Sequence, residues 1–349
     1  MTSSGRLAPI ETLPVELLQR VFFESLEFNL PRASLPIARA LSSHVVFTWL
    51  IRLAFSSENS SSDAALFVIP FLPFDYFGLS DDQRTALQTE VLKCRWCTVQ
   101  LVRQCQREYV ENVLNRKGAD LVLSETDTMR LRNGLQHGWG SVDAFDLHND
   151  RARRSRGDLV ISTQLRAANE HGTGEDPEGE SDNGRRKLAI WFNLGAVQIR
   201  EPRAIIQQTD VFRLPCVSNV SDPCRMPDRL LCPPWTEDKL QLLALFSTEA
   251  YIDDIQISRS KKVLRQLILD REYVIFERLL SLQIRVKGYA YPLRWPVGAN
   301  IFRLAARSAE SSDDDPFLRL LFLQHRDDIP PKDSSIRTLM QRYDRRTAR

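Results

Sequence analysis

Apolar residues recur at three- and four-residue steps through the first part of the chain, the spacing of amphipathic helices. The first stripe follows Leu13-Pro14, where proline suits an opening helical turn and Glu16 favours the positive helix start. It consists of Leu17, Leu18, Val21, Phe22 and Leu26. A second short helix opens at Pro36, and a third is capped by Ser42 or Ser43 and carries Val45, Val46, Trp49, Leu50 and Leu53. The pattern predicts three short helices within residues 10–55.

Helical spacing returns over residues 81–120, 238–246 and 262–282, whereas strand signals are few and short. We therefore predict a mainly α fold. Residues 1–9 are expected to be disordered, 56–63 to be a linker, 64–79 a buried segment, and 342–349 a frayed basic tail. Residues 167–186 are rich in Glu, Asp, Gly and Asn and cannot bury enough apolar surface to offset their ordering entropy, so they predict a disordered loop. The prolines of 215–235 argue against long regular structure there.

The chain carries 47 basic and 45 acidic side chains, a net charge of +2, so it has no global field that would recruit nucleic acid or an acidic membrane surface. The arginines of residues 151–156 are best explained as counter-charge for the acidic loop, because they lack interleaved aromatic residues for base stacking. No apolar run is long and continuous enough to span a bilayer or to form a secretory signal. We expect a cytoplasmic or nuclear protein with reduced cysteines.

Cys94-Arg-Trp-Cys97 is the short motif that invites a zinc or redox interpretation. A structural zinc site usually uses two CxxC pairs as ligands, and a redox CxxC has its first cysteine at the start of a helix that follows a strand. A second pair is missing and this one lies within helical spacing, so cysteines packed on a helix face explain it better. The sequence also lacks a nucleophile elbow, a phosphate-binding glycine loop and a histidine in a catalytic motif. We predict no catalytic residue, no metal and no cofactor, hence not an enzyme.

The segment Leu13-Pro14-Val15-Glu16-Leu17-Leu18-Gln19-Arg20-Val21-Phe22, followed by Leu26 and Leu30-Pro31, resembles the start of an F-box. Trp49 resembles the aromatic residue of the third F-box helix. The resemblance implies docking on the Skp1 adaptor of a cullin-RING (SCF-type) ubiquitin ligase, with the remainder of the chain capturing a target protein. The residues implied at or beside the Skp1 contact are Leu13, Pro14, Leu17, Val21, Leu26, Leu30 and Pro31.

A weak internal repeat links segments beginning at Val110, Phe276 and Phe317. The segment ending in Gly118-Ala119-Asp120 resembles the second helix and turn of an ankyrin repeat, which implies stacked helix pairs and a protein-binding surface. The general likeness of amphipathic helices is the other explanation. The predicted organisation is a disordered 1–9, an F-box-like unit at 10–55, ankyrin-like helical parts at 64–150 and 188–341, a basic cluster with an acidic loop at 151–187, and a tail at 342–349.

Three helices in about 45 residues enclose too small a core to stand alone. Their apolar faces need cover either from the following domain or from a partner protein. Two functions follow. The chain is an F-box-like substrate receptor that binds Skp1, or it is an interaction scaffold with ankyrin-like repeats that acts outside any ubiquitin ligase.

Overall fold

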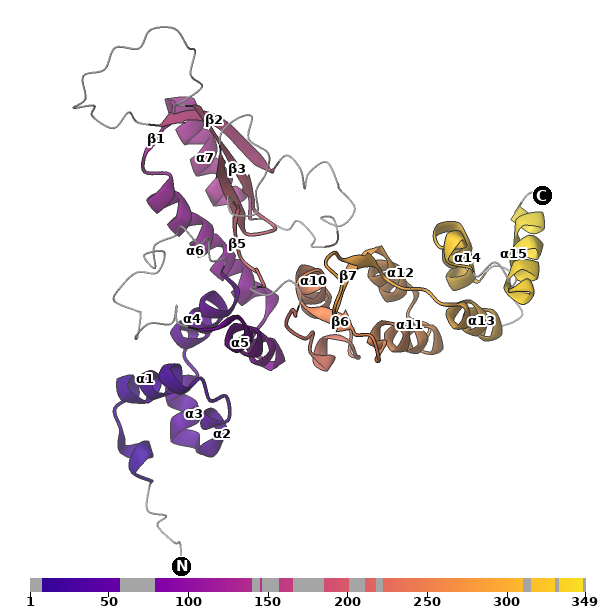
Figure 1. The fold of residues 1–349 in the computed structure, drawn as a ribbon, viewed down its shortest axis with the longest axis horizontal. Coiled ribbons are helices and arrows are strands. Elements are labelled where there is room, and N and C mark those ends of the chain that lie inside the picture. Colours follow the sequence, from indigo (N-terminus) through magenta and orange to yellow (C-terminus); the bar gives the residue numbers. More distant parts are fainter. Residues whose placement is uncertain are drawn as a thin grey trace, which may run out of the picture. The chain divides into compact units, whose positions relative to one another are not determined.

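The computed structural model describes residues 8–56, 79–139, 145, 157–165, 185–200, 211–217, 222–309, 315–329 and 333–347. The chain divides into two compact units (Figure 1). The first consists of Met1–Asp143 with Asp150–Asn219, and the second of Ala144–Asn149 with Val220–Arg349. The predicted linker at 56–63, the predicted buried segment at 64–79 and the arginine cluster at 151–156 lie outside the described residues, apart from Ser56 and Leu79.

The first unit opens with short helices whose ends are fixed by local chemistry. The elements are η1 (Pro9–Thr12), α1 (Val15–Ser25), α2 (Leu30–Ala33), α3 (Leu35–Leu41) and α4 (His44–Phe55). The hydroxyl oxygens of Ser34 and Ser43 accept hydrogen bonds from the third residues of α3 and α4 and so cap them. Helix α1 ends earlier than its apolar stripe, because Leu26 takes a left-handed conformation with φ of 48°.

Helix α4 is tied to the two helices that follow it, α5 (Asp81–Lys93) and α6 (Val99–Lys117). Most of its side chains are buried, including Trp49, Leu50 and Phe55. Buried Arg84 of α5 donates to the carbonyl oxygens of Leu53 and Ser56 at 3.2 and 3.1 Å. A cation at the carboxyl end of a helix satisfies carbonyls that have no helical partner. The last of the predicted N-terminal helices is thus built into the helical part that follows.

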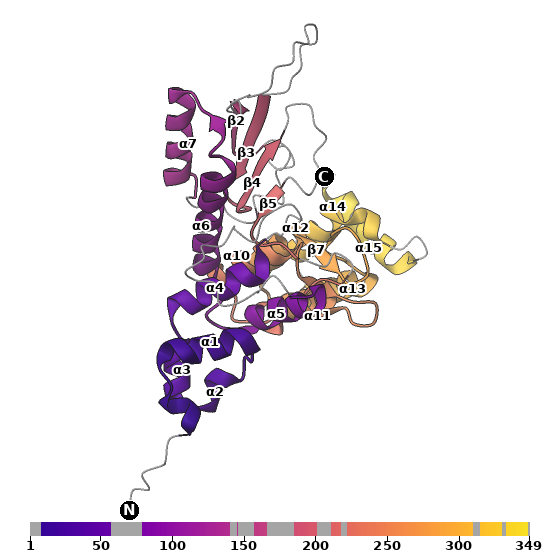
Figure 2. The ribbon, with the colours of Figure 1, turned by 60° about the vertical axis from the view of Figure 1, so that its left-hand side comes forward.

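A five-stranded antiparallel sheet completes the first unit, with α6 and α7 (Glu125–His137) packed beside it (Figures 1 and 2). Its strands, in spatial order, are β1 (Leu121–Val122), β2 (Leu159–Leu165), β3 (Arg185–Trp191), β4 (Ala196–Arg200) and β5 (Val211–Arg213). In the central pairs Ile161 lies opposite Leu188, and Ile190 opposite Val197. These four residues are buried, so the sheet core is a ladder of aliphatic cross-strand pairs.

This sheet shows that the predicted mainly α, ankyrin-like fold is wrong. At the first predicted repeat copy, the expected short helix and its partner form one continuous helix, α6, of 19 residues. Residues 99–117 therefore cannot fold back on themselves as a repeat pair. Most of the predicted acidic loop lies outside the described residues, but its last two residues, Arg185 and Arg186, begin β3.

The second unit combines a three-stranded sheet with stacked helices. Its elements are η6 (Asp228–Leu230), α10 (Glu237–Phe246), β6 (Tyr251–Asp253), α11 (Arg259–Leu269), α12 (Tyr273–Ser281), β7 (Gln283–Val286), β8 (Leu293–Arg294), α13 (Ala299–Ser308), α14 (Pro316–Gln324), η7 (Arg326–Asp328) and α15 (Ser334–Thr347). Strand β6 pairs in parallel with β7, which pairs antiparallel with β8. Helix α11 contacts α13 and α12 contacts α14 around buried Phe276, Phe302 and Phe317.

Among the described helices none alone is long and apolar enough to cross a membrane, while α3 and α4 pass that test only together, as a pair bent by 65°.

Candidate functional site

Helix α1 is apolar on two sides. Leu18, Phe22 and Phe23 are buried, and Gln19 ties the helix to α3 by donating to the Ala40 carbonyl oxygen at 3.1 Å. On another side Leu17 and Val21 follow each other at a four-residue step and remain 45% and 38% exposed. One side of the helix therefore packs into the local core, and another presents an apolar stripe at the surface.

The seven residues implied by the F-box resemblance lie along this N-terminal part. Pro14, the residue before α1, is exposed and continues the stripe of Leu17 and Val21 by one turn. The other four are half-buried: Leu13, the left-handed cap Leu26, and Leu30 with Pro31 at the start of α2. Pro14, Leu17 and Val21 together, named here the α1 stripe, are the part of the predicted site that reaches the surface.

Further exposed apolar side chains occur in the same helices, and we did not assign them to the site. Val15 is the first residue of α1, Leu35 opens α3, and Val45 lies in the first turn of α4. Val45 was predicted on the apolar side of the third helix, but it is exposed while Val46 is buried. Helical periodicity gives the spacing of a stripe, and only packing decides which neighbouring residue faces inward.

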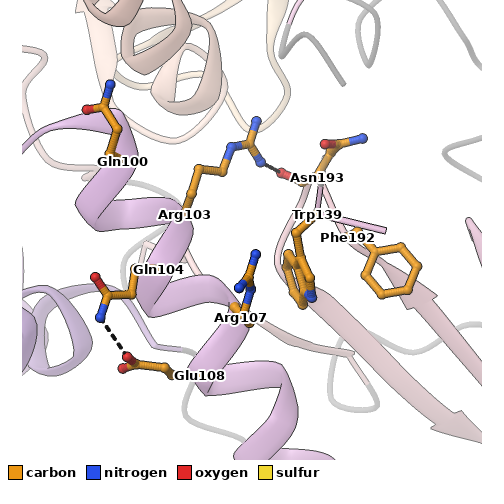
Figure 3. Close-up of a pocket in the computed structure, with 8 residues that line it drawn as sticks. All are labelled: Gln100, Arg103, Gln104, Arg107, Glu108, Trp139, Phe192 and Asn193. Atoms are coloured by element: carbon orange, nitrogen blue, oxygen red, sulfur yellow. Dashed lines mark hydrogen bonds between the residues drawn. The ribbon is translucent and has the colours of Figure 1, made fainter. Parts of the chain in front are cut away.

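A pocket of about 450 Å³ lies beside α6 in the same unit (Figure 3). It is lined on the α6 side by Gln100, Arg103, Gln104, Arg107 and Glu108, and on the other side by Trp139, Phe192 and Asn193. The first group comes from successive turns of one helix. The second comes from the residue after the C-cap of α7 and from the turn between β3 and β4. Its volume is that of a small-ligand or side-chain pocket.

Hydrogen bonds hold the helix side of this pocket in place. Arg103 donates to the Asn193 carbonyl oxygen and to Gln106 Oε1, the latter at 3.1 Å. Gln106 is fully buried and donates in turn to the Leu214 carbonyl oxygen at 2.6 Å. Glu108 accepts from Gln104 at 2.9 Å and forms an ion pair with Arg52 of α4. The pocket is therefore connected to the buried frame of the unit on the α4 and β5 sides.

Aromatic rings form the opposite wall. Trp139 and Phe192 meet edge to face, with ring centroids 5.2 Å apart, and the Arg107 guanidinium lies 5.9 Å from the centre of the Trp139 ring (Figure 3). This is the range of a cation–π contact. Gly134 and Gly138 make room for this wall, since a Cβ at Gly138 would lie 2.6 Å from the Phe192 ring.

The pocket was not found by reading the sequence. Its local signal is the pair Arg103 and Arg107, which lie four residues apart and hence on one side of a helix. Trp139, Phe192 and Asn193 reach the same place only because the sheet forms, and that sheet was not predicted.

The cysteine pair lies in the turn between α5 and α6, so the prediction that it packs on a helix face is wrong. Cys94 is the C-cap residue of α5, and its carbonyl oxygen accepts a hydrogen bond from the Cys97 N–H at 3.2 Å. Cys97 is buried just before Thr98, the cap of α6. Within the described part of the chain, His, Cys, Asp and Glu side chains nowhere gather in a group of three or more that could hold a metal ion.

No protein-family model matches the chain, and no curated protein and no solved structure is significantly similar to it.

Proposed function

We propose that the chain is an F-box-like substrate-recognition adaptor, which binds the Skp1 subunit of a cullin-RING ubiquitin ligase through its N-terminal helices and a target protein through the remainder. The observation that carries the proposal is the α1 stripe. Leu17 and Val21 stay exposed, although Leu18, Phe22 and Phe23 of the same helix are buried. Leu17 also belongs to the Leu13-Pro14-Val15-Glu16-Leu17 opening that resembles an F-box.

Aliphatic side chains left at the surface in a continuous stripe favour a protein partner, because burial of the stripe stabilises the complex at little conformational cost. The helix that carries the stripe is packed on α3, and its buried Leu18, Phe22 and Phe23 decide which side faces outward. A preformed surface loses little entropy on binding. Such an adaptor has no catalytic role of its own, and we expect it in the cytoplasm or the nucleus.

Co-expression of the full chain with Skp1 and a cullin scaffold, followed by co-purification, tests the proposal. We expect Skp1 and cullin to be recovered with the wild type, and Leu17→Ala/Val21→Ala to lower Skp1 recovery at least about tenfold, as loss of two interface anchors should. Met129→Ala is the matched control, because Met129 is a similarly exposed apolar residue of the same unit. Equal recovery with the wild type and the double variant, or no recovery with either, would overturn the proposal.

A folded wild-type chain that retains neither Skp1 nor cullin favours the other candidate, an interaction scaffold outside any ubiquitin ligase. The same exposed stripe would then serve a different protein.

A further inference from the structure

The pocket beside α6 is rich in hydrogen-bond donors, and one of them, Arg107, has no ion pair with a described residue. Arg107 is exposed, and its guanidinium lies over the neutral ring of Trp139. Arg103, one turn earlier, is held by the neutral oxygens of Gln106 and Asn193. Gln100, one turn earlier again, is exposed and makes no hydrogen bond to a described residue. Two guanidinium groups and an amide thus follow one side of α6.

The acidic residue that lines the pocket does not cancel this charge. Glu108 is held by Arg52 of α4 and by the amide of Gln104, away from the aromatic wall (Figure 3). Its carboxylate therefore has partners on the α4 side. An incoming acceptor would face Arg103 and Arg107 instead, and guanidinium groups bind oxyanions with two parallel hydrogen bonds.

The size and the aromatic wall of the pocket favour one anionic side chain over a polyanion. About 450 Å³ admits a side chain with its adjoining backbone. Nucleic-acid binding needs a longer basic track and exposed aromatic faces for base stacking. Here the Trp139 ring already contacts the Arg107 guanidinium and, edge to face, the Phe192 ring. These two aromatic rings are therefore occupied by contacts within the chain.

We propose that this pocket binds an oxyanion, carboxylate or phosphoryl, carried by a side chain of an extended segment of a partner protein. Arg107 is its main electrostatic contact, and Arg103 and Gln100 are further donors. The inference rests on the proposed function only in taking that segment to belong to the captured target.

Capped pentapeptides with alanines around one central residue test this by calorimetry on the full chain. We expect peptides with central phosphoserine or glutamate to bind, the glutamine peptide to bind at least about tenfold more weakly, and affinity to fall as salt is raised. The ratio of the phosphoserine and glutamate affinities identifies the preferred oxyanion. Equal binding of the glutamine peptide, or no binding of any peptide up to about 1 mM, would overturn the proposal.

Variants place the binding on α6. Arg107→Ala should weaken the anionic peptides about tenfold or more, and Arg107→Lys should weaken them less, because it keeps the charge but loses the planar pair of donors. Arg132→Ala is the matched control, since Arg132 is an exposed arginine on α7 of the same unit. In ¹⁵N spectra the Trp139 indole signal, assigned with Trp139→Phe, should shift on titration. Unchanged affinity of Arg107→Ala, or RNA binding that is stronger than peptide binding and independent of Arg107, would contradict the assignment.

The Skp1 test and the peptide test have independent outcomes. Loss of Skp1 binding in Leu17→Ala/Val21→Ala should leave peptide affinity unchanged, and Arg107→Ala should leave Skp1 recovery unchanged. Binding of anionic peptides without binding of Skp1 would support the pocket proposal and contradict the adaptor proposal.

Discussion

The side-chain amide of Gln88 donates a 2.7 Å hydrogen bond to the carbonyl oxygen of Ala54, in the last turn of α4. The same nitrogen donates to the Cys216 carbonyl oxygen at 3.1 Å, so one buried side chain of α5 joins α4 to the segment after β5. The last N-terminal helix is thereby covered by its own chain. The α1 stripe, by contrast, stays at the surface.

Gln88→Leu should lower the free energy of unfolding by about 1–3 kcal/mol, because it leaves one buried and one part-buried carbonyl oxygen without this donor. Urea denaturation measures the difference. Gln136→Leu, at an exposed position of α7, should change stability by less than about 0.5 kcal/mol. Similar losses in both variants would argue against the Gln88 link.

Leu18→Ala and Leu17→Ala should separate the two sides of α1. Leu18 is buried, so its truncation should leave a cavity and lower stability by about 2–5 kcal/mol. Leu17 is 45% exposed and its truncation should cost less than about 1 kcal/mol. Thermal unfolding of both variants checks the difference, and the reverse order would place the wrong side of the helix at the surface.

Gly195→Ala should destabilise the turn between β3 and β4 by more than about 2 kcal/mol, since a left-handed alanine alone costs about 1–2 kcal/mol. Gly195 has φ of 56°, and a Cβ there would lie 2.5 Å from Gln106 Cγ and 2.6 Å from the Leu214 carbonyl oxygen. Gly157, with φ of 85° and a nearest contact at 3.3 Å, is the comparison within the same unit. Gly157→Ala carries the backbone strain with a looser contact, so its measured loss in urea should be smaller.

Stability should depend on pH through Glu237. The Arg278 guanidinium donates to both of its carboxyl oxygens at 2.6 and 2.8 Å and lowers the pKa of Glu237 from 4.5 to about 2. A lowered pKa in the folded state adds stability that is present above about pH 4.5 and is lost as pH falls towards 2. The Glu237 side chain is 58% exposed, so screening should keep the contribution below about 1 kcal/mol.

The measurement is the difference in unfolding free energy between wild type and Glu237→Gln. It should be present at pH 7 and should shrink between pH 4.5 and 2. Asp238→Asn, at the next and exposed position of α10, should show a smaller difference at pH 7. A Glu237→Gln difference that is constant over this range would contradict the ion pair.

The rate of alkylation should be higher for exposed cysteines than for buried ones. Burial raises the pKa of the Cys105 thiol to about 12 and raises the pKa of the Cys224 thiol well above its usual range, so neither supplies thiolate near pH 8. Cys232 is exposed. Iodoacetamide should therefore modify Cys232 first in the native chain, and Cys105 and Cys224 only after unfolding, as peptide mass spectrometry would show. Early modification of Cys105 would contradict its burial on α6, where its thiol faces the Thr48 carbonyl oxygen of α4.

The sequence by itself indicated α1, α3 and α4 of the N-terminal helices, but not the short α2 and not all of the helix ends. The apolar steps around Leu18 and Phe22, and the caps at Ser34 and Ser43, act between residues three or four apart, and helices with such caps lie there. Ser43 is one of the two serines predicted to cap the third helix, whereas the cap at Ser34 was not predicted. The end of α1 depended on the left-handed Leu26, which apolar spacing does not reveal.

Only the tertiary structure decided the sheet and the pocket. Ile161 faces Leu188 across two seven-residue strands that are separated by residues 166–184, and neither strand alternates apolar and polar residues with a period of two. Pairing between such segments is determined by the whole core, so helical spacing nearby favoured a mainly α fold. The pocket follows from the same long-range pairing, because β3 and β4 bring Phe192 and Asn193 to the arginines of α6. Contacts between distant residues depend on packing, which local sequence patterns do not encode.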